Sequence, residues 1–376
     1  MKITMKIATI ITVFVISAGS VFAQAGAAAV PFLLISPDAR SSGMGETGVA
    51  IADDINAIYW NPGGLGFLDE YQSYSDFNFD DDEYKPFRQV ALSFSQWLPQ
   101  FNADLFYSYG TYGQYFDEVN GTVAFNFIFM NLGEFTRTSS GGDVLGKFIS
   151  NEFAVGLSWG TMIAPDLGAG VQLRYIQSNL TPTSVQQQDA GTGRSVSFDL
   201  GVLWKPTDLQ FIGLDLQDRL ALGLNLQNLG PKVTYINESD PLPTQFKLGM
   251  AYTLVRDEFN DLKIAADFAK LLVNRKIDPA DSTRSISDPL PLSLVSGWET
   301  PGGEYSIGFE YWYEYIVALR GGYFTEPSAI GDRQFWTFGA GVRYDIFRLD
   351  FSYILTLEEN HPLANTMRFS LLVENL

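Results

Sequence analysis

Residues 121–130 read GTVAFNFIFM, and apolar side chains occupy every second position of this stretch. One face is apolar and largely aromatic: Val123, Phe125, Phe127 and Phe129. The opposite face is small or polar: Thr122, Ala124 and Asn126. Successive side chains of a β-strand point to opposite sides, so this period of two predicts a strand with one apolar and one polar face.

The same alternation recurs from about residue 89 to the end of the chain, in windows of about ten residues, the length with which a tilted strand crosses a bilayer. The fifteen windows are 89–97, 103–110, 121–130, 152–160, 167–175, 194–204, 220–227, 245–254, 262–269, 291–299, 305–313, 316–324, 335–344, 348–356 and 366–374. Aromatic residues make up 14% of the chain, which is typical of the aromatic girdles of outer-membrane barrels. We therefore predict an all-β fold, a transmembrane antiparallel β-barrel.

The polar faces are then expected to line the lumen, and they carry Arg174, Lys247, Arg320, Arg343 and Arg368. A lipid-facing position tolerates arginine poorly, whereas lumen positions are more permissive. On this basis the sequence predicts that Phe127→Arg is harmful and that Asn126→Arg is tolerated.

The number of strands follows from the connections. Bacterial single-chain barrels have an even number of strands, with long exterior loops and short periplasmic turns. The long connections are 131–151, 178–193, 228–244, 325–334 and 357–365, and the short ones are 161–166, 255–261, 314–315 and 345–347. The two classes alternate only if window 291–299 belongs to one exterior excursion, 270–304. We therefore predict about fourteen strands, with both chain ends in the periplasm.

Residues 1–23 have the pattern of a secretory signal peptide. Lys2 and Lys6 precede an apolar run from Ile7 to Ile16, and Val21-Phe22-Ala23 forms a small-residue cleavage site. We expect cleavage after Ala23, export, and residence in the outer membrane of a Gram-negative bacterium. The alternative is a retained anchor helix.

Residues 24–88 differ from the windows that follow. They combine glycine-rich turns with a helical candidate at Val49–Tyr59. A barrel of fourteen strands has a wide lumen. We therefore expect an N-terminal hatch over 24–88 that plugs the barrel formed by 89–376.

Composition excludes several classes of function. The chain has no cysteine, which excludes disulfides and thiol chemistry. Its net charge is −19, and loss of Lys2 and Lys6 makes it −21, which excludes nucleic acid as a partner. The acidic run Asp80-Asp81-Asp82-Glu83 lacks the ligand spacing of a calcium loop and favours a solvated loop over a metal site.

No catalytic constellation is visible, and we expect neither enzymatic activity nor a cofactor. Gly43–Gly48 matches the dinucleotide pattern GxGxxG but lacks the surrounding strand and helix. His361, the one histidine, lies between Asn360 and Pro362 in an expected loop. Glu310 and Glu314 form a possible carboxylate pair but are expected to line the lumen near a turn.

The segment Pro31–Gly66, PFLLISPDARSSGMGETGVAIADDINAIYWNPGGLG, resembles the N-terminal hatch of FadL-like barrels. Within these it is most similar to the PorV/PorQ family of the type IX secretion system, as are Arg174–Leu180, Ala221–Tyr235, Asp267–Val273, Gly308–Tyr313, Leu319–Phe324 and Asn365–Leu371. The hatch motif Asn61-Pro62-Gly63 is also explained as a turn that ends the helix.

The resemblance implies a carrier without catalytic activity. Such a protein collects clients bearing a C-terminal secretion domain from the translocon and passes them to a cell-surface attachment complex. Outer-membrane lipid or lipopolysaccharide surrounds it. The alternatives are a passive channel for hydrophobic small molecules and, least favoured, an outer-membrane hydrolase. A docking surface needs exposed apolar anchors. Excursion 270–304 offers Leu271, Leu272, Val273, Leu290, Leu292 and Leu294.

Overall fold

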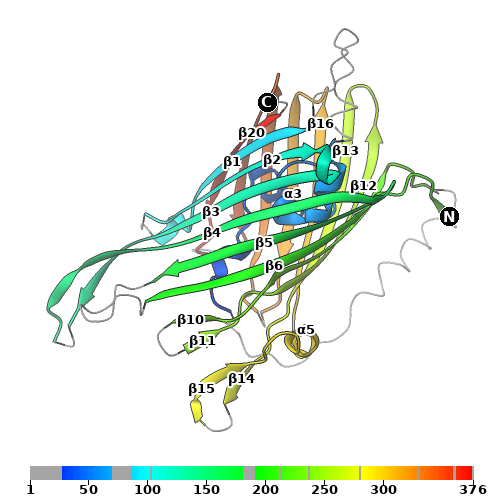
Figure 1. Cartoon of the computed structure of the whole chain (residues 1–376). Helices are drawn as coiled ribbons and strands as arrows, with labels where there is room; N and C mark the ends of the chain where they lie inside the picture. The colour runs from blue at the N-terminus through cyan, green and yellow to red at the C-terminus, as the bar shows by residue number, and fades with distance from the viewer. Residues whose placement is uncertain are drawn as a thin grey trace, which may run out of the picture.

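The computed structural model describes residues 28–69, 86–101, 104–139, 141–180, 191–211, 214–235, 238–278, 281–328, 330–358 and 361–374. Fourteen antiparallel strands close into a barrel (Figure 1). They are β1 Arg88–Gln96, β2 Phe106–Phe116, β3 Gly121–Thr138, β4 Val144–Ala164, β5 Leu167–Asn179, β6 Thr192–Trp204, β9 Leu220–Leu229, β12 Gln245–Arg256, β13 Asn260–Leu271, β16 Glu304–Tyr313, β17 Val317–Thr325, β18 Gln334–Tyr344, β19 Phe347–Thr356 and β20 Met367–Glu374. The barrel closes where β1 pairs with β20, and the predicted strand count is confirmed.

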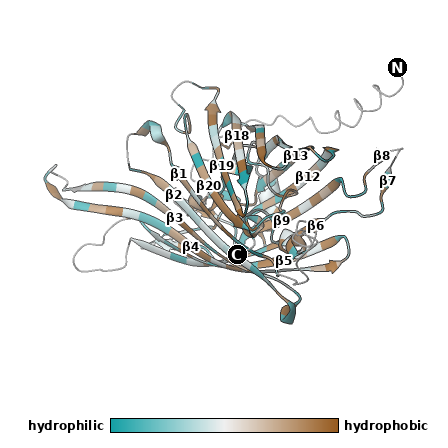
Figure 2. Cartoon of the chain, turned by 90° about the horizontal axis from the view of Figure 1, so that it is seen from above, coloured by the Kyte–Doolittle hydropathy of each residue, from teal (hydrophilic) through white to brown (hydrophobic). Residues whose placement is uncertain are grey.

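The predicted alternation is also confirmed. Phe125 and Phe127 of β3 are exposed on the outer surface, whereas Asn126 between them is 1% exposed. Figure 2 shows the resulting change between apolar and polar residues along the strands. The outer wall is therefore apolar without any partner protein, as a lipid-facing surface requires.

The two ends of the barrel differ. At the turn end the connections are tight except for 205–219 between β6 and β9. Glu314 and Tyr315, for example, both have positive φ between β16 and β17, the geometry that suits the twist of a hairpin. The other end, the loop end, carries the longer connections. Its small elements are η4 Pro99–Phe101, the hairpin of β10 Val233–Tyr235 with β11 Glu238–Asp240, the hairpin of β14 Arg275–Asp278 with β15 Asp281–Ser287, α5 Ser293–Ser296 and η6 Gly297–Glu299. The turn end carries η5 Asp117–Val119 and the hairpin of β7 Gln210–Phe211 with β8 Leu214–Asp215.

Two regions, 291–299 and 131–151, had been excluded from the barrel wall by the sequence pattern. Window 291–299 contains α5 and η6 rather than a strand, which confirms its exclusion from the wall. The prediction of a long loop at 131–151 was wrong, because β3 extends to Thr138 and β4 begins at Val144. A register shift between Asn131 and Glu134 interrupts the period of two and hides the strand from pattern analysis.

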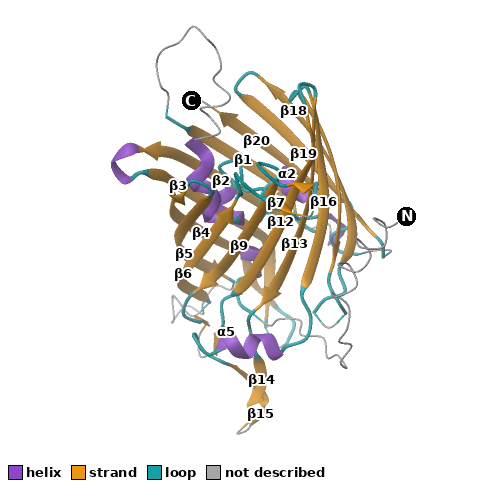
Figure 3. Cartoon of the chain, turned by 90° about the vertical axis from the view of Figure 1, so that its right-hand side faces the viewer, coloured by secondary structure: helices purple, strands orange, loops and turns teal. Residues whose placement is uncertain are grey.

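The N-terminal segment, residues 28–68, lies inside the ring of strands (Figure 3). Its short helices are η2 Pro31–Leu34, α2 Ala39–Ser42, α3 Ala57–Trp60 and η3 Pro62–Phe67. The helix predicted at Val49–Tyr59 is thus confined to a single turn near its end. Within the described ranges no helix is both long and apolar enough to cross a membrane. The expected signal peptide 1–23 and the acidic run 80–83 lie outside the described residues.

Candidate functional site

The N-terminal segment is joined to the wall by a buried network of ion pairs. Arg40 of α2 contacts Asp53 and Asp54 within the segment, and its Nη2 lies 2.7 Å from Glu310 Oε1 on β16. The network continues through the wall: Arg320 pairs with Glu310 and Asp350, Arg348 pairs with Asp54 and Asp350, and Lys263 pairs with Asp53. Four cations thus meet four carboxylates, so the buried charge of this group is balanced.

The two carboxyls that the segment contributes to this network, Asp53 and Asp54, are held ionised. Burial alone raises the pKa of Asp53, but Arg40 and Lys263 outweigh it and hold this pKa well below its ordinary value. For Asp54, burial is likewise outweighed by Arg348 and Arg40, so its pKa is also lowered. The segment is therefore charged where it faces the wall and keeps this charge at neutral pH.

The hatch motif attaches the opposite side of the segment. Asn61 ends α3, and its Nδ2 donates to the carbonyls of Val49 and Val202, both at 2.9 Å. Its Oδ1 accepts from the Gly63 N–H at 3.0 Å. A Cβ on Gly63 would lie 2.8 Å from the Leu203 nitrogen, so only glycine allows this approach to β6. The motif is thus a turn, as the residues predicted, and also a contact with the wall.

An inner cavity of about 30 Å³ remains beside the segment. Its lining includes Glu46, Lys247, Asp267 and Glu304. The Lys247 ammonium lies over the ring of Trp60, 5.0 Å from its centroid. A space of this size accommodates one or two water molecules. It is too small and too charged for a hydrophobic solute.

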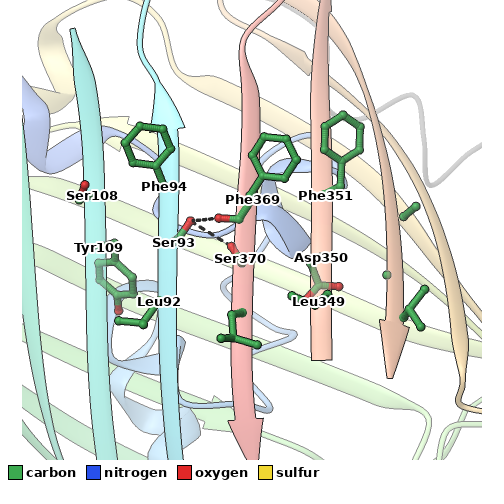
Figure 4. Close-up of a pocket in the computed structure, with 14 residues that line it drawn as sticks. Leu92, Ser93, Phe94, Ser108, Tyr109, Leu349, Asp350, Phe351, Phe369 and Ser370 are labelled. Atoms are coloured by element: carbon green, nitrogen blue, oxygen red, sulfur yellow. Dashed lines mark hydrogen bonds between the residues drawn. The ribbon is translucent and has the colours of Figure 1, made fainter. Parts of the chain in front are cut away.

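A larger groove, of about 570 Å³, lies on the outer surface of the wall (Figure 4). Leu92 and Phe94 of β1, Phe369 of β20 and Phe351 of β19 project beside it. Behind them the Ser93 hydroxyl donates to the Phe369 carbonyl at 3.1 Å. The groove is apolar and lies across the closing seam, on the surface that an outer-membrane barrel turns to lipid.

The predicted docking residues fall into three groups. Leu272 and Val273 are each 3% exposed, so as anchors for a partner they are unsuitable. Leu271, Leu290 and Leu294 are half-buried, and Leu292 is exposed. Leu272 is buried because the turn at Gly297 packs on it: a Cβ on Gly297 would lie 2.6 Å from the Leu272 Cα.

Sequence reasoning missed the most exposed apolar side chains of the excursion. Ile277 is 69% exposed and Val295 is 72% exposed, and Ile286 and Trp298 are also exposed. Ile277 and Ile286 lie in a stretch dominated by polar residues, where only a strand pattern over 275–287 would have revealed them.

The motifs considered as active sites are not brought together. Gly43–Gly48 packs on the wall, where a Cβ on Gly45 would lie 2.7 Å from the Ile307 carbonyl oxygen. Glu310 is buried in the ion network, whereas Glu314 is exposed on a turn. His361 Nδ1 accepts from the Leu363 N–H, which accounts for it as a loop residue. Among the described residues no cluster of carboxylates and histidine could hold a metal ion.

A family model described as type IX secretion system protein PorV matches residues 23–278. The chain belongs to the PorV family. Members of this family are type IX secretion system proteins. No curated protein matches the chain.

Solved structures show the same fold. A deletion mutant of the TodX monoaromatic hydrocarbon channel has a TM-score of 0.51 and 13% identity, and the match covers 90% of this chain and 97% of that one. The toluene transporter TodX of Pseudomonas putida has a TM-score of 0.48 and 14% identity, covering 95% and 99%. A FadL homologue of Pseudomonas aeruginosa has a TM-score of 0.48 and 11% identity, covering 90% and 97%. The chain therefore shares the barrel fold of the TodX deletion mutant.

Proposed function

We propose that this protein is a carrier in type IX secretion. It binds clients bearing a C-terminal secretion domain at its loop end, receives them from the translocon and passes them to the cell-surface attachment complex. Membership of the PorV family supports the pathway. The supporting observation on this chain is the group of large apolar side chains that excursion 270–304 leaves exposed, above all Ile277, Leu292 and Val295. Exposed apolar groups of this kind mark protein interaction sites.

The membrane setting is part of the proposal. The signal peptide 1–23 directs export, the apolar wall contacts outer-membrane lipid and lipopolysaccharide, and the loop end faces the exterior. Residues 28–68 serve as the hatch, because they fill the barrel and are tied to the wall on two sides. The intact mass of membrane-extracted protein tests the first point: it should correspond to a chain that begins at Gln24. A mass that includes residues 1–23 would contradict export with cleavage.

The second candidate is a channel for hydrophobic small molecules, which the FadL-like fold favours. The inner cavity beside the N-terminal segment weighs against it. A ligand pocket needs an apolar cavity of hundreds of cubic ångströms, whereas this cavity holds about 30 Å³ and has Glu46, Lys247, Asp267 and Glu304 in its lining.

One pair of matched variants separates the two candidates. Ile277 and Ser285 are direct partners across the β14–β15 hairpin and both are exposed. Ile277→Asp combined with Val295→Asp should leave the barrel folded and cause clients to accumulate in the cell, because an interface concentrates its energy in a few apolar anchors. Ser285→Asp adds a charge at the same place and should leave secretion unchanged. Normal secretion by the double variant would remove this surface from the proposal. Normal secretion together with impaired uptake of a labelled aromatic solute would favour the channel.

A further inference from the structure

Strands β3 and β4 are longer than their neighbours and leave the barrel together as a two-stranded ribbon, residues 132–138 and 144–150. The ribbon projects from the loop end (Figures 1 and 2). Pairing of β2 with β3 ends at Phe106 and Asn131, and pairing of β4 with β5 ends at Asn151 and Asn179. Beyond these points β3 and β4 pair only with each other, from Glu134–Ile149 to Thr138–Val144.

The ribbon is formed in the absence of any partner. The rings of Phe135 and Phe148 stack across it with centroids 5.6 Å apart. Its tip is closed by the Ser139 N–H, which donates to the Asp143 carbonyl at 2.8 Å. Val144, Leu145 and Ile149 are exposed along it. An element that is ordered, exposed and partly apolar costs little conformational entropy when it binds.

The free edge of β3 carries unpaired backbone groups. The Ser139 N–H points to β4. The register shift between Arg137 and Thr138 places its extra residue, Leu145, on β4, so β3 keeps its alternation there and the N–H groups of Arg137 and Phe135 are expected to point to β4 as well. The N–H and C=O groups of Glu134, Thr136 and Thr138 therefore point away from β4. No described strand pairs with this edge. Native sheets usually protect such an edge with proline or by covering it, and residues 131–151 contain no proline.

We propose that residues 134–138 bind an extended segment of the client protein by β-strand addition. This inference rests on the proposed carrier function and names the part of the client that is recognised: main chain in extended conformation, with little dependence on its side chains. Backbone pairing of this kind suits a carrier that must accept many different sequences, because main-chain hydrogen bonds supply affinity in every case. The ribbon and the β14–β15 hairpin lie at the same end of the barrel (Figure 1), so one client can contact both.

Two substitutions at one position test the edge. Thr136→Pro removes an N–H that points away from β4, so the β3–β4 ladder keeps its hydrogen bonds. Thr136→Ala removes the side chain and keeps the N–H. The probe is the purified C-terminal secretion domain of a client from the same organism, titrated onto the full-length detergent-solubilised protein. Unchanged heat-dependent gel migration controls for the barrel fold.

We expect Thr136→Pro to weaken binding about tenfold or more, as loss of one or two backbone hydrogen bonds does, and Thr136→Ala to bind like the unchanged protein. Equal binding by all three proteins, or equal loss in both variants, would overturn the inference while leaving the carrier function intact. Failure of the unchanged protein to bind the domain would overturn the carrier function itself. A dimer of the unchanged protein that Thr136→Pro dissociates would assign the edge to a second copy instead.

Discussion

Arg40 Nη2 lies 2.7 Å from Glu310 Oε1, and this contact joins residues 270 positions apart, one in the N-terminal segment and one in the wall. Both side chains are almost fully buried, and each takes part in further ion pairs. The segment is therefore held by charges that cannot be released singly without leaving a partner unpaired in the interior.

Arg40→Gln should detach the segment. Removal of one partner from a buried ion pair costs about 3–5 kcal/mol. Here three cations would remain for four carboxylates, so one buried negative charge would be left uncompensated. Limited proteolysis should cleave residues 28–68 in the variant while the barrel keeps its heat-dependent gel migration. Lys147→Gln is the matched control, because Lys147 and Glu134 form an ion pair with side chains 62% and 53% exposed, for which about 0–1 kcal/mol is expected. Equal protection of the segment in both variants would contradict the conclusion that the buried ion pairs hold the segment to the wall.

Acid should release the segment only at low pH. The folded-state pKa values of Asp53 and Asp54 are lower than their ordinary values. Their contribution to stability is therefore fully present above the ordinary carboxyl range and is lost as pH falls through the lowered values. Burial raises the pKa of Asp38 and Glu46, so their protonation as the pH falls does not destabilise the segment. Thermal midpoints should therefore not decline between pH 7 and pH 5, and should decrease only when the pH is below about 4. A decline between pH 7 and pH 5 would mean that other groups control the attachment.

Gly45→Ala should displace the segment from β16 and β17. Gly45 has φ +72°, and a Cβ there would lie 2.7 Å from the Ile307 carbonyl oxygen and 2.8 Å from the Tyr323 nitrogen. Gly142→Ala provides the control, since Gly142 has φ +89° but no atom within 4 Å of a Cβ. Both variants carry the backbone cost of about 1 kcal/mol, so protease sensitivity of residues 28–68 in Gly45→Ala alone would measure the close approach. Sensitivity in both, or in neither, would show that the approach is unimportant.

Phe127→Arg should impair assembly into membranes, because arginine at mid-bilayer costs about 2–4 kcal/mol in such barrels. Phe127→Leu should assemble normally. Asn126→Arg, which sequence reasoning expected to be tolerated, should also fail. Asn126 is buried, and its Oδ1 accepts from Gln172 Nε2 at 3.1 Å, so the lumen has no room for arginine at this depth. The fraction of folded protein in lipid vesicles, read from gel migration, tests all three.

Alternation alone was enough to predict the wall, because each strand needs only local information: Phe125 and Phe127 face out and Asn126 faces in whatever the rest of the chain does. The ribbon was missed because Leu132 and Gly133 form a bulge that breaks the period. The interior could not be derived from local pattern. Nothing near Arg40 indicates Glu310 or Arg348. The segment was expected to plug the barrel, but local pattern does not show which polar side chains of the wall it contacts.

The exposure of individual apolar residues in excursion 270–304 could not be predicted from the sequence. Leu272 and Val273 resemble interface anchors in sequence, yet both side chains are buried by packing within the excursion itself. Ile277 is isolated among polar neighbours and Val295 follows Leu294 in an apolar stretch, so neither gives a sequence signal of exposure, although they are the most exposed apolar residues of that region.

The hydrogen bond from the Ala39 N–H to the Ser370 hydroxyl, 2.8 Å long, joins the N-terminal segment to β20, 331 positions later. The N-terminal segment can therefore complete its contacts with the wall only after β20, the last strand of the barrel, has formed. Until the wall has formed, the charged groups of the segment lack their ion-pair partners on the strands and must remain solvated. Docking of the segment is therefore a late event of biogenesis, and a barrel truncated before β20 should never acquire its filled interior.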